Sequence, residues 1–135
     1  MTSKPRFLNP ETLSKPPGYT HVVDMAGPAR IIYIAGQLAL DRGGKIVGAG
    51  DFRAQAIQVF ENLKFALAAV GAGMNDVVKI NNYILDMAHR PVFREVRDMY
   101  VNKAAPPAST LVGVTALAYP EALIEIEAIA LLPGG

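Results

Sequence analysis

The sequence contains no cysteine and only two histidines, His21 and His89. Without thiols, the chain cannot form disulfides, use a cysteine nucleophile, or bind zinc or iron–sulfur clusters through thiolates. No spacing of His, Asp and Glu matches a metal site, and no nucleophile-elbow motif is present. The sequence therefore gives no sign of a metal centre or of a Ser-His-Asp triad.

Long hydrophobic runs are also missing, because no stretch approaches the ~18–20 uncharged apolar residues of a membrane span. Residues 1–10 are polar and lack the apolar core of a signal peptide, so we expect a cytoplasmic protein. The net charge is only +1, whereas sequence-independent nucleic-acid binding needs a dense basic surface. We therefore expect neither a membrane nor nucleic acid as the main partner, and a small-molecule ligand is compatible with this charge.

The 135 residues are 51% hydrophobic and 19% charged, which is typical of one folded domain covering residues 1–135. Four prolines predict an extended arm over residues 2–18. Hydrophobic patterning then predicts strands at 19–25, 30–35, 45–47, 76–85, 109–114 and 123–132, and helices at 51–70 and 91–101. This order predicts an α+β fold with two helices on one face of a mixed sheet. Because the last strand is apolar on both sides, we expect an oligomer to bury the other face.

Both predicted helices are amphipathic. Asp51 is a suitable N-cap for the first helix, whose apolar face consists of Ala56, Val59, Phe60, Leu63, Leu67 and Val70. The inward side of the second helix consists of Val92, Val96, Met99 and Tyr100.

A basic stripe of Arg90, Arg94 and Arg97 lies on one face of the second helix, because these residues are four and three positions apart. Such a stripe either is a solvated surface or brings an arginine to an anion in a cleft. Arg97 is the best placed of the three, since it is closest to the apolar edge formed by Phe93 and Tyr100.

Glu125 and Glu127 alternate with apolar residues in the last predicted strand, so both carboxylates point to one face, about 6.5–7 Å apart. Desolvation there raises a carboxyl pKa and makes the group a usable general acid or base near neutral pH. Alternatively, both groups are solvated or pair with an arginine at a subunit contact.

Two other segments adjoin predicted strands. Gly36 and Gln37 follow an apolar strand, where a glycine either lets a ligand approach the backbone N–H or forms a turn or bulge. Prolines at 106–107 fix the approach to a later strand. The hydroxyls of Ser109 and Thr110 at its start bond either a ligand or the local backbone.

Together, these segments resemble the RidA family, also called YjgF and historically labelled L-PSP endoribonucleases. The resemblance extends from Asn9 to Ala130. Its most specific part is Pro107-Ala108-Ser109-Thr110 followed by Ile124-Glu125-Ile126-Glu127-Ala128-Ile129-Ala130. Further support comes from Ile34-Ala35-Gly36-Gln37, Gln55, Asn62 and Val77-Val78-Lys79.

The resemblance implies a chorismate-mutase-like α+β fold and a homotrimer with ligand clefts between subunits. It also implies hydrolysis of imines and enamines, notably 2-imino acids, with no metal or organic cofactor. Carried over by position, Tyr19 lines the cleft, the Gly36 N–H binds the substrate carboxylate, and Glu125 orients or protonates through water.

The sequence departs from the family pattern at Ser109, where the Pro-Ala-Arg-Ser or Pro-Ala-Arg-Thr motif has an arginine that clamps the substrate carboxylate. A desolvated arginine–carboxylate pair contributes about 1.5–3 kcal/mol, so its loss predicts ~10- to 150-fold weaker binding of a 2-imino acid.

We therefore expect a hydrolase of imines, enamines or related C–N compounds with altered substrate choice. Glu125 is its predicted acid or base, and the predicted substrate-binding residues are Tyr19, Gly36, Gln37, Arg97, Ser109 and Thr110. The alternatives are a non-catalytic metabolite-binding trimer and, as the older label suggests, an endoribonuclease.

Overall fold

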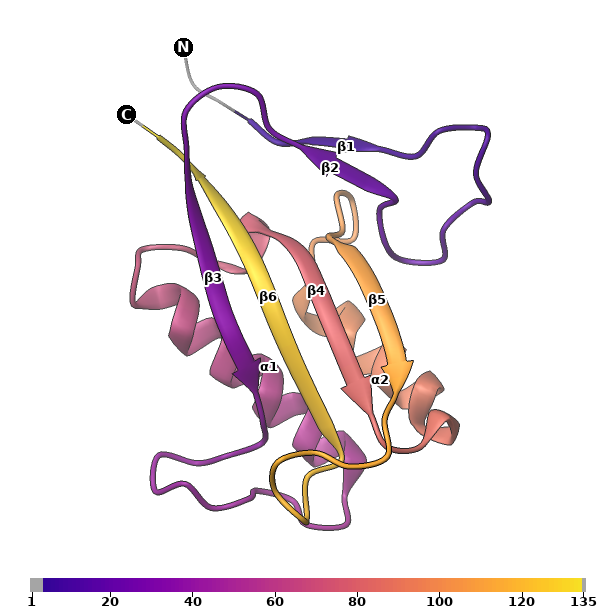
Figure 1. Cartoon of the computed structure of the whole chain (residues 1–135), viewed down its shortest axis with the longest axis vertical. Coiled ribbons are helices and arrows are strands. Elements are labelled where there is room, and N and C mark those ends of the chain that lie inside the picture. The colour runs from indigo at the N-terminus through magenta and orange to yellow at the C-terminus, as the bar shows by residue number, and fades with distance from the viewer. Residues whose placement is uncertain (1–3, 135) are drawn as a thin grey trace.

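The structure is a computed structural model that describes residues 4–134, and in it two helices cover one face of a four-stranded sheet (Figure 1). The strand order is β3-β6-β4-β5. β6 is antiparallel to both of its neighbours, whereas β4 and β5 are parallel. The predicted α+β fold with a mixed sheet is therefore confirmed.

The elements of this layer follow the hydrophobic pattern closely. They are β3 (Ala29–Gln37), α1 (Phe52–Ala68), β4 (Val77–Ile84), α2 (Arg90–Tyr100), β5 (Ala108–Gly113) and β6 (Ile124–Pro133), with short 3-10 turns at Met74–Asp76 and Met87–His89. Asp51 caps α1 by accepting a hydrogen bond from the Ala54 N–H at 3.0 Å, as predicted. Alternate residues of β6 are buried under the helices, which leaves Glu125 and Glu127 on the uncovered face.

The core lies between the sheet and the helices, and one polar side chain belongs to it. Gln55 of α1 is fully buried. Its amide donates to the carbonyls of Gly48 and Glu121, and its oxygen accepts from the Leu123 N–H at 2.8 Å. Gln55 thus fastens α1 to the loops that precede α1 and β6.

Several predicted details are wrong. Residues 45–47 form no strand, because only an isolated bridge joins Leu40 and Ile46 beside a turn organised by Asp41. Helix α1 ends at Ala68, so Val70 lies outside it and is exposed. Met99 is 62% exposed, because the inward line of α2 runs through Phe93 and Val96 instead.

The predicted arm contains a short strand, β1 (Arg6–Leu8), which pairs with β2 (Val22–Asp24); residues 2 and 3 of the predicted arm lie outside the described part of the chain. Thr20 joins the arm to the segment that enters β5 through two hydrogen bonds, and Figure 1 shows the arm on the β5 side of the sheet. Its hydroxyl donates to the Pro106 carbonyl at 2.5 Å, and its N–H donates to the Pro107 carbonyl at 3.2 Å. The arm is therefore packed beside β5.

The uncovered face of the sheet carries large apolar side chains. Tyr33 is 77% exposed and Ile31 is 58% exposed, both on the edge strand β3. Burial of this face in an oligomer remains a prediction.

Among residues 4–134, the structure has no helix long and apolar enough to cross a membrane.

Candidate functional site

The predicted site residues fall into two groups near opposite edges of the sheet. Gly36 and Glu125 lie together on the uncovered face, at the β3 edge. Tyr19, Arg97 and Ser109 line one pocket at the β5 edge, on the side of the helices. Because β6 and β4 lie between β3 and β5, one chain does not bring the two groups into a single cleft.

Gly36 lies directly against the Glu125 carboxylate. A β-carbon at position 36 would be 1.9 Å from Glu125 Oε2. The register of β3 against β6 also shifts between Ile34 and Gln37, which is the mark of a β-bulge. The structure therefore confirms the bulge alternative for Gly36. It also shows a close approach by the Glu125 side chain, and the approach of a ligand to the Gly36 N–H remains a prediction.

The two carboxylates of β6 have different surroundings. Glu127 Oε1 accepts hydrogen bonds from the Tyr83 hydroxyl at 2.7 Å and from Asn81 Nδ2 at 3.1 Å. The hydrogen bond to Glu127, together with partial burial, raises the pKa of Tyr83. The Glu125 carboxylate has no such hydrogen bond or ion pair within residues 4–134. Of the two carboxylates, Glu125 is thus the one without a side-chain partner in the described part of the chain.

The pocket at the β5 edge has a volume of about 180 Å³. It is lined by Pro17, Tyr19, Arg90, Phe93, Arg94, Arg97, Ser109 and Leu111. Arg97 is only 6% exposed, and its guanidinium carbon lies 6.0 Å from the centre of the Phe93 ring. Its Nε and Nη2 both donate to Asp98 Oδ1 at 3.0 Å. The sequence alternative of a purely solvated stripe is therefore wrong for Arg97.

The loop before Tyr19 rests on this guanidinium. Gly18 has a φ of +94°, and a β-carbon there would lie 2.4 Å from Arg97 Nη2. Only a glycine accepts both the left-handed backbone and the close contact. The arm thereby holds Arg97 in the pocket.

Ser109 is oriented by a residue that the sequence analysis missed. Asn82 of β4 is 1% exposed, and its Nδ2 donates to Ser109 Oγ at 3.0 Å and to the Thr110 carbonyl at 2.9 Å. Because the Ser109 oxygen accepts from Asn82, its O–H remains able to donate into the pocket. The available signal was an asparagine at an inward position of an apolar strand.

Two predicted binding residues lie outside both groups. Thr110 faces away from Ser109, and its hydroxyl accepts from Lys79 Nζ at 2.9 Å. The Gln37 side chain donates to the carbonyl of Ala35 at 3.0 Å and borders a different pocket, beside α1. Both side chains thus make local contacts.

Within residues 4–134, no three His, Asp or Glu side chains are grouped closely enough to hold a metal ion.

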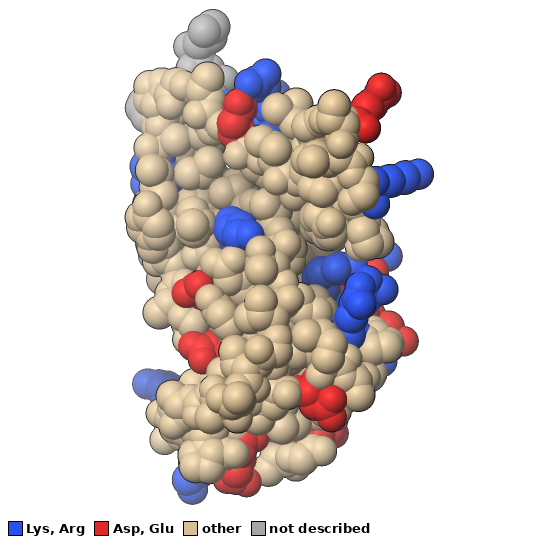
Figure 2. All heavy atoms as spheres, turned by 45° about the vertical axis from the view of Figure 1, so that its right-hand side comes forward, with Lys and Arg blue, Asp and Glu red and all other residues tan. Residues whose placement is uncertain are grey.

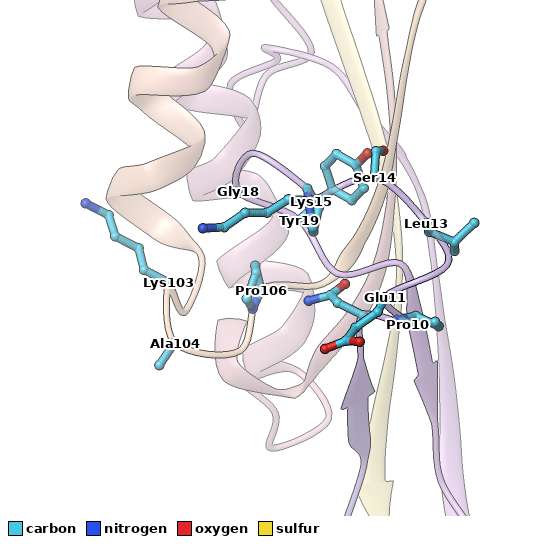
Figure 3. Close-up of a pocket in the computed structure, with 12 residues that line it drawn as sticks. Pro10, Glu11, Leu13, Ser14, Lys15, Gly18, Tyr19, Lys103, Ala104 and Pro106 are labelled. Carbon is cyan, nitrogen blue, oxygen red and sulfur yellow. The ribbon is translucent and has the colours of Figure 1, made fainter.

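Tyr19 lines both the arginine-lined pocket and a larger cavity of about 550 Å³, and Figure 3 shows the larger cavity. The arm forms one side of this cavity, and residues after α2 form the other. Lys15 extends from the arm and Lys103 from the opposite loop (Figure 3). Glu11 lines the same cavity, so the charged side chains of this lining sum to +1.

Comparison with known proteins identifies the family. Residues 12–132 match the family model described as Endoribonuclease L-PSP. A RutC family protein of Pyrococcus horikoshii is 40% identical over 121 residues, which cover 89% of this chain and 92% of that protein. The 2-iminobutanoate/2-iminopropanoate deaminase of Dermatophagoides farinae is 34% identical over 101 residues, which cover 75% of this chain and 76% of that protein.

A solved structure gives the same result. The Rid family protein YyfB from Yersinia pestis, described as a protein of unknown function, superposes with a TM-score of 0.83 at 38% identity. The match covers 95% of this chain and 98% of that chain. The chain therefore belongs to the RidA family, to which the Endoribonuclease L-PSP model corresponds.

Proposed function

We propose that the protein hydrolyses imines or enamines of the 2-imino-acid type to 2-oxo acids and ammonia. An enamine first gains a proton at C3 and loses one from nitrogen, which gives the imine. The oxygen of water then forms a bond to C2, both hydrogens of water pass to the nitrogen, and the C2–N bond breaks to release ammonia. The observation that carries this proposal is the buried Arg97 guanidinium in the same pocket as Ser109.

Arg97 supplies the charge that the sequence motif lacks at position 109. A carboxylate in the pocket meets a guanidinium held by Gly18 and Phe93, and it also accepts a hydrogen bond from the Ser109 hydroxyl. A charge-assisted pair of this kind contributes about 1.5–3 kcal/mol. The guanidinium that binds the substrate carboxylate is therefore supplied by Arg97 of α2 instead of by an arginine at position 109 of β5.

Glu125 is the proposed acid and base, because it is half-buried and makes no competing hydrogen bond within residues 4–134. We propose that a second copy brings its β3 edge, with Gly36 and Glu125, to the β5 edge of the first copy. Such a head-to-tail contact closes into a ring, consistent with a homotrimer. It would also cover the exposed side chains of Ile31 and Tyr33.

The test is the release of ammonia from 2-iminobutanoate generated in the cuvette by an amino acid oxidase. Wild-type protein should accelerate the reaction beyond its spontaneous rate. Glu125→Gln should lower kcat by ~10²–10⁴-fold, which is the range for a general acid or base. Glu121→Gln is the matched control, because Glu121 is exposed and contributes only its carbonyl to the Gln55 contact. No acceleration by wild-type protein, or equal rates for both variants, would contradict the proposal.

A second candidate is a metabolite-binding trimer without catalysis. It is favoured by the fact that Tyr19, Arg97 and Ser109 meet within one chain and need no Glu125. A small acid that raises the melting temperature by mass action, but is never consumed, would support this alternative.

A further inference from the structure

We infer, building on the proposed function, that the preferred substrate carries a second carboxylate, as a dicarboxylic 2-imino acid does. The pocket that holds Arg97 is also lined by Arg90 and Arg94. Arg97 alone can pair with both oxygens of one carboxylate, so Arg90 and Arg94 would then have no anionic partner. The geometry thus points to a second anionic group on the ligand.

The charges in the pocket are not balanced by the protein. Arg97 pairs with Asp98, whereas neither Arg90 nor Arg94 forms an ion pair with a carboxylate among residues 4–134. The three guanidiniums and the Asp98 carboxylate together leave a net charge of +2 in and beside the pocket. Lys and Arg side chains gather beside a recess on this side of the molecule (Figure 2). One substrate carboxylate leaves one positive charge unmatched, and a second carboxylate matches it.

Arg94 is the better placed of the two remaining arginines. It lies three residues before Arg97, so the two side chains are neighbours on one face of α2. Arg94 is half-buried, whereas Arg90 is exposed and more strongly screened by solvent. We therefore assign the second carboxylate to Arg94.

The size of the pocket restricts the ligand to a small metabolite. Its volume of about 180 Å³ is below the ~300–1,000 Å³ of typical ligand pockets. Phe93 and Leu111 supply apolar wall between the charged groups. A short carbon chain with a charged group at each end suits this lining.

The decisive comparison uses two substrates that differ only at the far end. 2-Iminoglutarate, made by L-glutamate oxidase, ends in a carboxylate, and 2-iminopentanoate of the same chain length ends in a methyl group. Wild-type protein should favour 2-iminoglutarate by ~5- to 30-fold in kcat/KM, which is about 1–2 kcal/mol at 1.4 kcal/mol per tenfold. Arg94→Gln should bring this ratio close to one. Arg42→Gln is the control, because Arg42 lies beside α1 in another pocket and should keep the wild-type ratio.

A binding measurement separates this inference from the proposed function. Calorimetry with the stable products, 2-oxoglutarate and 2-oxopentanoate, should show the same ratio and the same loss in Arg94→Gln. If neither imine is hydrolysed, the proposed function fails and the binding ratio alone decides the inference. Equal affinity for the two oxo acids, or a preference that persists in Arg94→Gln, would overturn it.

Discussion

The carboxylate of Glu125 occupies the space in which any residue other than glycine at position 36 would place its β-carbon. That β-carbon would lie 1.9 Å from Oε2 and 2.8 Å from the carboxyl carbon of Glu125. The two residues come from different strands, β3 and β6, and the β-bulge at Gly36 makes their approach possible. The position of Glu125 is therefore set by the absence of a side chain opposite it.

Gly36→Ala should move the Glu125 carboxylate without unfolding the protein. A flexible carboxylate can rotate away, so we expect a fall in kcat of at least tenfold with a melting temperature within a few degrees of wild type. Gly73→Ala is the control, since Gly73 also has an ordinary φ and no neighbour within 4 Å of the added carbon. Wild-type kcat in a folded Gly36→Ala protein would show that the close approach has no catalytic role.

Gly18→Ala should weaken ligand binding as well as stability. The left-handed φ of Gly18 costs an alanine about 1–2 kcal/mol, and the added carbon also displaces the Arg97 guanidinium. Gly71→Ala is the control. It introduces the same backbone strain without a steric contact, because Gly71 has a φ of +75° and no neighbour within 4 Å of the added carbon. Denaturation should therefore show similar losses for the two variants, and calorimetry with 2-oxobutanoate should show weaker binding only for Gly18→Ala. Equal binding by both would argue against a role for the loop.

Exchanging the arginine between positions 97 and 109 tests whether the charge has been relocated. Arg97→Gln should weaken 2-oxobutanoate binding by ~10- to 150-fold, the equivalent of about 1.5–3 kcal/mol. Ser109→Arg in the wild-type background places a second guanidinium beside Arg97 and should give no comparable gain. Ser109→Arg combined with Arg97→Gln should recover much of the lost affinity. Failure of the double variant to exceed Arg97→Gln, in a folded protein, would contradict the relocation.

The parts of the fold that could be predicted from the sequence are those with a strong local period. Helix α1, the strand β6 and the shared face of Glu125 and Glu127 follow from apolar spacing alone. Gly36 was a candidate because it follows an apolar strand, whereas Tyr19 was a candidate only through the family resemblance. The burial of Arg97 could not be predicted, because it depends on Gly18 packing onto a helix from a distant part of the chain. Asn82 was missed for a similar reason, since its partners on β5 are known only once the parallel register is known.

Tyr100 makes the free energy of unfolding depend on pH in the alkaline range. Burial, followed by the hydrogen bond to Glu61 at 2.7 Å, raises the pKa of Tyr100 to about 12 from its ordinary 10.0. The neutral phenol is therefore favoured in the folded state. Its contribution to the free energy of unfolding is fully present below about pH 10 and is lost as the pH rises toward 12.

Urea denaturation between pH 8 and 11.5 provides the measurement. The stability difference between wild type and Tyr100→Phe should shrink across the upper part of this range. Tyr119→Phe is the control, because it removes the hydroxyl of an exposed tyrosine. A constant difference for Tyr100→Phe would mean that the phenol titrates alike in the folded and unfolded chain.

The distance between the two groups of site residues has a consequence for mixtures of subunits. If each cleft takes Glu125 from one copy and Arg97 from the next, Glu125→Gln and Arg97→Gln disable different sides of the same interface. Two preparations that are each impaired alone should therefore rescue each other after subunit exchange. In an equal mixture, each of the two subunits that form a cleft has an even chance of supplying its intact residue. About a quarter of the clefts would therefore contain both Glu125 and Arg97.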